Sequence, residues 1–190
     1  MDATTAETFA MLDNRSLWQM TVRCDGALAA DGVPAAVCGG VAVALQGYRR
    51  NTADVDMIVR RGDAERVRDV LLREGLTWNE NRVQFESDDG VLQLLYAGDS
   101  AGRGTGVTVT DPEGDPNVEI REGIRVVRLS RLVEMKIACG EANVRRTHKD
   151  FADVVELIAA RGLDGSFVRL LHRNVRETFR RLVRNARGEV

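Results

Sequence analysis

The sequence predicts a mixed α/β fold, in which a mixed β-sheet flanked by helices precedes a helical C-terminal half. Up to about residue 128, short apolar runs bounded by glycine or acidic residues alternate with amphipathic stretches, as expected of strands and helices in turn. From residue 129 onward the apolar residues recur only at helical spacing. We therefore expect an α/β core over residues 1–128, including an N-terminal helix, and a helical region over residues 129–190.

In the first part, each element is predicted from the spacing of its apolar residues and from the residues that end it. A short apolar run ends in Gly39-Gly40, which is typical of a buried strand that enters a tight turn. The segment 98–117 is rich in Gly, Asp, Thr and Pro, and predicts an exposed loop with at most one short strand near 107–109. The predicted elements are a helix over 6–31, strands over 35–38 and 54–59 around a short helix over 41–46, an amphipathic helix over 63–74, and hairpins over 82–96 and 118–127.

The second part predicts helices over residues 129–140, 147–161 and 166–187, the last with a break. In the middle helix Thr147 is a suitable N-cap, which puts Asp150 in the first turn, where a carboxylate suits the helix dipole. The apolar stripe of this helix leaves Asp150 on its flank and turns Asp153 further toward solvent.

Composition limits the class of protein. Hydrophobic residues make up 44% of the chain and charged residues 29%, which suffices for a core and argues against general disorder. No apolar run approaches the roughly 20 residues that span a bilayer, and the acidic N-terminus lacks the order of a secretory signal. We expect a cytoplasmic protein with no membrane partner, in which Cys24, Cys38 and Cys139 pack as small apolar side chains.

The cations are distributed unevenly along the chain. Residues 166–190 hold seven arginines and two acidic residues, so this segment carries +5 and the rest of the chain −7, for a total of −2. An arginine face suits a phosphate backbone, although pairing with the acidic body or plain solvation explains it equally well. Its members, at spacings of three and four, are Arg169, Arg173, Arg176, Arg180, Arg184 and Arg187.

The strongest functional signal lies between residues 37 and 59. Gly39-Gly40 projects no side chain, so a phosphate or a backbone can approach closely, and the helix that follows directs free N–H groups at an anion. Asp54 and Asp56 alternate with apolar residues on the next strand, which places both carboxylates on one face. Two such carboxylates repel unless a cation lies between them, and Mg²⁺ suits such a pair. The alternative is a glycine turn followed by two solvated acids.

This stretch resembles the defining motif of the nucleotidyltransferase superfamily, in the form G-G-x-A-x-x-x-x-G-x-x-R-x-T-x-D-x-D that is similar to the small bacterial branch of AbiEii-type toxins. The resemblance covers about residues 35–160. It implies a nucleotidyltransferase fold and the transfer of a nucleoside monophosphate from a nucleoside triphosphate (NTP) to an acceptor. It also implies Mg²⁺ on Asp54 and Asp56. The residues it places around the triphosphate are Gly39, Gly40, Arg49 or its neighbour Arg50, and Thr52.

A second region, K-x-A-x-G followed by H-K-D-F-A-D, resembles the AbiEii-type pattern and would complete the site from the helical part. Lys136 lies in the apolar stripe of its helix, where an ammonium must reach solvent or find an anion. The resemblance implies that Lys136 contacts the triphosphate and that Asp150 is a general base or orients the acceptor hydroxyl. Without it, Lys136 is an edge residue with a packed stem and Asp150 a capping carboxylate.

The chain departs from the superfamily at Gln93, which occupies the place of a third carboxylate on a later strand. An amide serves neither as a base nor as an anionic metal ligand. Either Asp150 supplies the missing acid function, a nearby acid (Glu86, Asp88 or Asp99) substitutes, or the protein is catalytically weak or inactive.

We therefore predict an Mg²⁺-dependent nucleotidyltransferase whose substrate is an NTP. The acceptor predicted from the arginine face is RNA, such as a tRNA end; a protein, or a small molecule as in aminoglycoside nucleotidyltransferases, stays open. The AbiEii resemblance adds a toxin role with a cognate antitoxin as partner. The rival hypothesis is a catalytically impaired nucleotidyltransferase-like module that binds nucleotide or a partner, and Gln93 is the feature that favours it.

Overall fold

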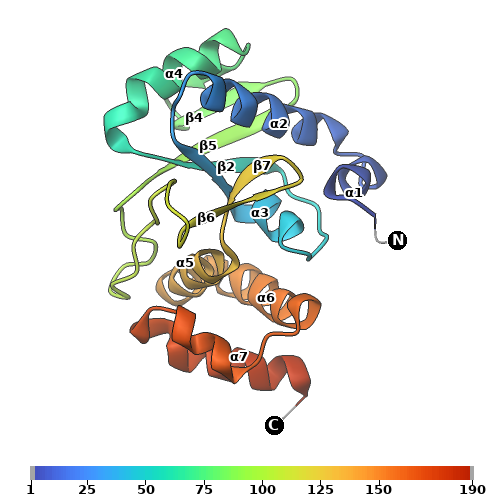
Figure 1. The fold of residues 1–190 in the computed structure, drawn as a ribbon, viewed down its shortest axis with the longest axis vertical. Helices are drawn as coiled ribbons and strands as arrows, with labels where there is room; N and C mark the ends of the chain where they lie inside the picture. Colours follow the sequence, from blue (N-terminus) through green and yellow to red (C-terminus); the bar gives the residue numbers. More distant parts are fainter. Residues whose placement is uncertain (1–2, 189–190) are drawn as a thin grey trace.

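The computed structural model describes residues 3–188 and contains a seven-stranded mixed sheet (Figure 1). The strand order is β3-β4-β5-β2-β1-β7-β6, with β2–β5 and β1–β7 parallel and the other pairs antiparallel. The predicted mixed α/β class is thereby confirmed. The strands are β1 (Ala35–Cys38), β2 (Asp54–Val59), β3 (Thr77–Asn79), β4 (Gln84–Ser87), β5 (Gly90–Tyr96), β6 (Val118–Arg121) and β7 (Ile124–Val127).

Helices cover both faces of the sheet, and the C-terminal helices form a further layer. α2 and α4 lie on one face, whereas α3 lies on the other, with α5, α6 and α7 beyond it (Figure 1). The helices are α1 (Thr5–Met11), α2 (Arg15–Ala30), α3 (Gly39–Leu45), α4 (Ala64–Arg73), α5 (Leu129–Ala142), α6 (Val144–Arg161) and α7 (Arg176–Arg187), with 3₁₀ turns η1 (Arg61–Asp63), η2 (Gly165–Leu170) and η3 (Arg173–Val175).

Two hydrophobic clusters hold these layers together. The larger one fills the space between the sheet and the helices α2, α3 and α4, and also takes in Leu132 of α5 and Leu157 of α6. The smaller one joins α5, α6 and α7 through Ile137, Ile158 and Phe179. Both clusters draw on α5 and α6, so these helices fasten the C-terminal layer to the sheet. The proposed division of the chain after residue 128 stays a prediction.

Two predicted helices are corrected by the structure. The single helix expected over residues 6–31 is wrong, because Asp13 adopts a left-handed φ of 56° and separates α1 from α2. Thr147 is not an N-cap: α6 begins four residues earlier than that prediction requires, Asn143 caps it, and the Thr147 hydroxyl donates to the Gly140 carbonyl at 2.6 Å. Asp150 consequently lies beyond the first turn of its helix.

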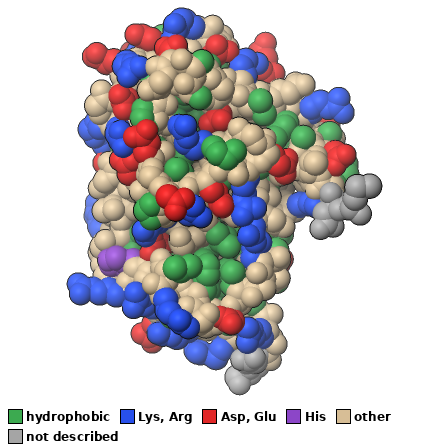
Figure 2. Space-filling model, in the orientation of Figure 1, with side chains coloured by type: hydrophobic (Ala, Val, Ile, Leu, Met, Phe, Trp, Pro, Cys, Tyr) green, Lys and Arg blue, Asp and Glu red, His purple; other side chains and the backbone are tan. Residues whose placement is uncertain are grey.

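The predicted continuous arginine face is also corrected. Arg169 lies on η2 and Arg173 on η3, so only the arginines from residue 176 onward share α7. Lys and Arg side chains nevertheless gather over the C-terminal layer, at the bottom of the view in Figure 2. The C-terminal surface is therefore basic but not one helical stripe.

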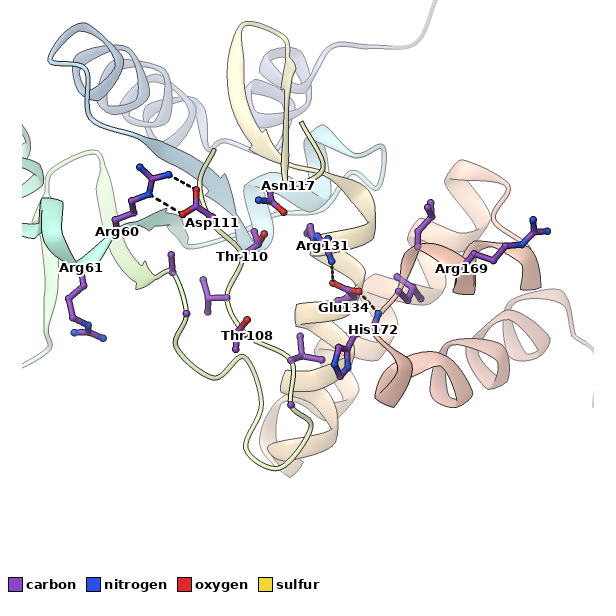
Figure 3. A pocket seen from close by; sticks show the side chains of 17 residues that line it. Arg60, Arg61, Thr108, Thr110, Asp111, Asn117, Arg131, Glu134, Arg169 and His172 are labelled. Carbon is purple, nitrogen blue, oxygen red and sulfur yellow. Dashed lines mark hydrogen bonds and ion pairs between the residues drawn. The ribbon is translucent and has the colours of Figure 1, made fainter. Parts of the chain in front are cut away.

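The long segment between β5 and β6 has no regular strand. Only one isolated bridge, between Ser100 and Thr108, occurs where a short strand was expected near residues 107–109. The segment passes beside α5 (Figure 3), and Gly102 permits that approach, because a Cβ there would lie 2.0 Å from the Ala138 carbonyl oxygen. Across residues 3–188, no helix combines the length and apolar character needed to cross a bilayer.

Candidate active site

The two predicted carboxylates lie on one face of β2, as the period of a strand requires. Val55 and Met57 are fully buried on the opposite face. Asp56 stands opposite Cys38 in β1 and Gln93 in β5, so it lies at the centre of the sheet. Asp54 is nearer the strand end, where the Thr52 hydroxyl donates to its carboxylate at 3.1 Å.

The glycine pair allows the turn to press against these carboxylates. Gly39 has a φ of +60°, and a Cβ built on it would lie 1.8 Å from Oδ2 of Asp56. A Cβ on Gly40 would lie 2.3 Å from Oγ1 of Thr52. No residue with a side chain fits either position without displacing a neighbour, and a left-handed φ adds strain at Gly39. The close approach inferred from the sequence is thus an approach to Asp56 and Thr52.

Asp56 carries a charge that its surroundings leave uncompensated. Burial, followed by the charge of Asp54, raises the pKa of Asp56 to about 6, although Lys136, Arg146 and Lys149 act in the opposite direction. Among the described residues no group forms an ion pair or a hydrogen bond with this carboxylate. A half-buried carboxylate beside a second acid is an arrangement that a cation stabilises.

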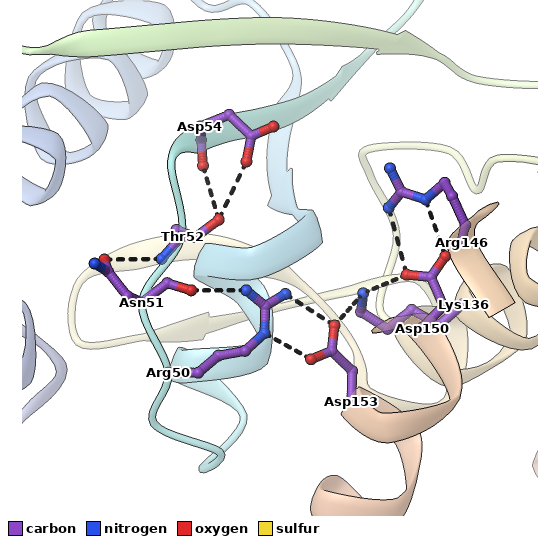
Figure 4. Close-up of polar contacts among 8 residues, drawn as sticks. All are labelled: Arg50, Asn51, Thr52, Asp54, Lys136, Arg146, Asp150 and Asp153. Atoms are coloured by element: carbon purple, nitrogen blue, oxygen red, sulfur yellow. Dashed lines mark hydrogen bonds and ion pairs between the residues drawn. The ribbon is translucent and has the colours of Figure 1, made fainter. Parts of the chain in front are cut away.

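Lys136 lies in a buried ionic network rather than free in a cavity (Figure 4). Its Nζ is 2.6 Å from Oδ2 of Asp153 and 3.1 Å from Oδ1 of Asp150. Asp153 also accepts two hydrogen bonds from Arg50, at 2.6 and 2.8 Å. The prediction that Asp153 faces solvent is therefore wrong, because its side chain is only 2% exposed between two cations that offset the cost of burial.

Arg146 is a second cation that the sequence did not single out. Its Nε donates to Oδ2 of Asp150 at 3.0 Å, four residues along the same helix. Burial raises the pKa of Asp150, but the hydrogen bond from Arg146 and the charge of Lys136 outweigh it and leave this pKa below its usual value. A carboxylate so held is a weak base, which favours a positioning role for Asp150. The i,i+4 spacing of Arg146 and Asp150 is the signal that could have found this pair.

A cavity of about 250 Å³ joins the two halves of the predicted site. Gly39, Asp56, Lys136 and Asp150 all line it, together with Gln93 and Arg146. The other predicted residues lie outside its lining. Arg49 donates to the Ala3 carbonyl at 2.5 Å, and Arg50 donates to Asp153 of the ionic network. Gly40, Thr52 and Asp54 adjoin the cavity through the turn and the strand end.

The donor set fits an Mg²⁺ ion whose remaining ligands come from the substrate and from water. No group of three or more His, Cys, Asp or Glu residues that could hold a metal occurs in residues 3–188, so no complete protein site exists there. Asp54 and Asp56 supply two carboxylates on one strand face, and Mg²⁺ is usually bound by one or two carboxylates plus waters and phosphates. The uncompensated charge of Asp56 is the observation that supports this fit.

Gln93 occupies the place expected from the sequence, directly beside Asp56 in the parallel β2–β5 pair. None of the acids considered as substitutes lines the cavity. Asp99 pairs with Arg61 at 2.8 Å, and Glu86 is bound by Asn79 and Gln84. The carboxylate content of the cavity is thus limited to Asp56 and Asp150.

This geometry agrees with the family of proteins that the chain resembles. A model of the family described as uncharacterised nucleotidyltransferase matches residues 2–173. The chain belongs to this nucleotidyltransferase family. Members of the wider fold share its architecture, which confirms the predicted nucleotidyltransferase fold. No curated protein matches the chain significantly.

Solved structures similar to this nucleotidyltransferase support its fold at low sequence identity. The complex of ANT(2'')-Ia with adenylyl-2''-tobramycin has a TM-score of 0.58 and 14% identity over 86% of this chain and 98% of that one. A protein assigned as a nucleotidyltransferase from H. pylori gives 0.52 and 17% over 94% and 83%. Another from Thermotoga maritima, TM1012, gives 0.50 and 14% over 72% and 92%. The AbiEii-type branch stays a prediction.

Proposed function

We propose that the protein is an Mg²⁺-dependent nucleotidyltransferase that moves a nucleoside monophosphate from an NTP to an acceptor. The observation that carries this proposal is the cavity in which Gly39, the uncompensated Asp56 and two cations converge. Asp54 and Asp56 would hold the metal, which, when bound, supplies positive charge to the triphosphate. The cytoplasm, which holds both NTP and Mg²⁺, is its proposed compartment.

The remaining side chains then have separable roles. Lys136 and Arg146 line the cavity and would stabilise negative charge that develops on the phosphates. Asp150 and Asp153 hold Lys136, and Arg50 holds Asp153, so these three act through the lysine. Gly39 and Gly40 would leave room for the triphosphate beside the carboxylates, with Thr52 fixing the orientation of Asp54.

Transfer of a labelled nucleotide tests the proposal. The purified chain would be incubated with Mg²⁺ and each of four NTPs labelled at the α-phosphate, with total RNA, with itself as protein acceptor, and with aminoglycosides. We expect label transfer that is lost in Asp56→Asn and retained in Asp63→Asn, a carboxylate variant away from the cavity. Absence of transfer with every NTP and acceptor, in protein that binds Mg²⁺–NTP, would favour the alternative below.

The alternative function is a nucleotidyltransferase-like module that binds nucleotide or a partner without turnover. Gln93 supports it, because the amide leaves the cavity without a third acid beside Asp56. Calorimetry separates the two: Mg²⁺-dependent NTP binding that Asp56→Asn abolishes, with no transferred label, identifies the module.

The acceptor is proposed from charge. RNA suits the basic C-terminal surface, which includes the exposed Arg180 and Arg184. The neighbour ANT(2'')-Ia was solved with adenylyl-2''-tobramycin, which supports a small molecule as the other candidate acceptor. An AbiEii-like toxin role would require a cognate antitoxin. Arrest of growth on induced expression, absent in Asp56→Asn, is the result expected of a toxin.

A further inference from the structure

A second, larger cleft lies on the other side of the segment that connects β5 to β6. It has a volume of about 740 Å³ and is lined by that segment, by α5 and by the turn at η2 (Figure 3). Val109 lines both this cleft and the cavity that holds Asp56. On α5, Arg131 and Glu134 face the cleft, whereas Lys136 faces the cavity. The two spaces are therefore neighbours that share one wall.

Arginine is the most frequent charged residue in the lining of this cleft. Four arginines line it against two carboxylates, Asp111 and Glu134. Two of the arginines form ion pairs with carboxylates. Arg60 binds Asp111 at 2.8 and 3.0 Å and Glu113 at 2.8 Å, and Arg61 binds Asp99 at 2.8 Å. The other two, Arg131 and Arg169, retain donors for a ligand.

Arg131 is fixed in place but incompletely bonded. Its Nη1 donates to Oε2 of Glu134 at 2.8 Å, while its Nε is buried without a hydrogen-bond partner. Glu134 is only 4% exposed, and its other oxygen accepts from the backbone N–H of His172. Arg169 projects from η2 and forms no ion pair with any residue in the described part of the chain. Arg131 thus presents an incompletely bonded guanidinium group to the cleft, whereas Arg169 is exposed at the edge with its guanidinium group turned outward (Figure 3).

We propose that this cleft, the acceptor cleft, binds a phosphate group of the acceptor through Arg131, and that the exposed Arg169 turns in from the edge to complete the contact. Planar guanidinium groups match phosphate oxygens and form charge-assisted hydrogen bonds with them. A polycationic aminoglycoside is disfavoured, because its ammonium groups would meet Arg169, which is unpaired within residues 3–188, at the edge of the cleft. The term acceptor rests on the proposed function, whereas the phosphate site rests on the cleft alone.

Binding of a defined probe tests the cleft. A fluorescein-labelled oligouridylate would be titrated into the full chain, with tobramycin and a sugar phosphate as unlabelled competitors. We expect Arg169→Gln to weaken oligouridylate binding by about tenfold, the loss of one charge-assisted contact. Arg131→Gln, which is less exposed, should act in the same direction. Arg184→Gln, on the exposed side of α7, is the matched control and should change binding by less than about twofold.

The outcomes separate this inference from the proposed function. Equal losses in Arg169→Gln and Arg184→Gln would overturn the cleft and assign binding to the general basic surface. Competition by tobramycin, with none by the sugar phosphate, would overturn the phosphate assignment. If Arg169→Gln weakens binding and no variant transfers label, the phosphate site is supported and the proposed enzymatic activity is overturned. If transfer occurs with an acceptor KM unchanged in Arg169→Gln, the enzymatic activity is supported and the phosphate site is overturned. A sugar phosphate that competes as well as the oligouridylate identifies a small phosphorylated acceptor.

Discussion

Gln93 lies directly opposite Asp56 on the neighbouring parallel strand, so one of the two side chains that flank this half-buried carboxylate across the sheet is an amide. This relationship sets the charge of the cavity. A third carboxylate at that place would repel Asp56 in the absence of a metal, whereas the amide adds no charge. The chain therefore has less demand for a cation than a site with three acids.

Replacing Gln93 with glutamate tests this account. We expect Gln93→Glu to tighten Mn²⁺ binding by about tenfold, because a second acid beside Asp56 adds both a ligand and a charge. The metal-free variant should lose about 1 kcal/mol of stability through repulsion. Calorimetric Mn²⁺ titration and thermal unfolding measure both effects. Gln93→Asn is the neutral control, and Mn²⁺ affinity unchanged in Gln93→Glu would place this position outside the metal site.

We expect Asp56 to lower the stability of the metal-free protein and to be required for label transfer. Asp56→Asn removes a buried charge that has no partner among residues 3–188, so the metal-free protein should gain about 1–2 kcal/mol at pH 8 while label transfer is lost. Urea unfolding and the transfer assay report the two results. A metal-free Asp56→Asn that unfolds at lower urea than the parent would show that the carboxylate has structural partners.

Metal binding should depend on pH through Asp56. Its pKa is about 6 in the folded protein, against about 4 in an unfolded chain. The folded state therefore holds the extra proton between these values, and the contribution of this group to metal-free stability is lost as pH rises through 6. Mn²⁺ affinity should instead increase with pH, by about tenfold per pH unit below 6, and should be constant above it. Asp56→Asn should flatten this profile, and an unaltered profile in that variant would assign it to another group.

The local motif could be predicted because it depends on neighbours in sequence. The strand period places Asp54 and Asp56 on one face without knowledge of the fold, and Gly39-Gly40 marks a close approach whatever approaches. The place of Gln93 follows from the same reasoning, since a parallel partner strand aligns it with Asp56.

The ionic network could not be predicted because its partners are far apart in the chain. Asp153 is 103 residues from Arg50, and helical spacing alone turns it away from the apolar stripe of α6. The start of α6 at Val144 also shifts the residues assigned to its first turn. Burial of Asp153 depends on two cations that only the packing of α5 and of the Arg50 loop brings to it. The acceptor cleft depends likewise on a segment without regular structure.

Gly39 should be intolerant of any side chain for two separable reasons. Gly39→Ala meets Asp56 at 1.8 Å and also requires a left-handed φ of +60°. Gly32 has a similar φ of +66° but open space around its Cβ, so Gly32→Ala isolates the backbone cost, about 1–2 kcal/mol. We expect Gly39→Ala to cost at least about 2 kcal/mol more than Gly32→Ala in urea unfolding, and to abolish NTP binding. Equal costs would mean that Asp56 moves aside freely.

The Arg50–Asp153 pair should couple far more strongly than an exposed pair. Its side chains are 17% and 2% exposed. Asp153→Asn leaves Arg50 without a counter-charge and Lys136 with Asp150 alone, at a cost of about 3–5 kcal/mol. A double-mutant cycle with Arg50→Gln should give a coupling energy of about 1–3 kcal/mol. The same cycle on Arg73 and Asp31, whose side chains are 62% and 40% exposed, should give less than about 1 kcal/mol.

The functional half of this prediction concerns Lys136, because Asp153, which does not line the cavity, holds the lysine ammonium at 2.6 Å. If that contact positions the lysine, Asp153→Asn should raise the KM for NTP, and Arg50→Lys, which keeps the charge but not the paired hydrogen bonds, should raise it less. The KM is measured on the folded fraction, so a purely structural role of Asp153 would leave it unchanged, whereas a positioning role would raise it. Unfolding in the presence of saturating NTP measures the loss of stability separately. A coupling energy as small as that of the exposed pair would show that Asp153 serves Lys136 alone.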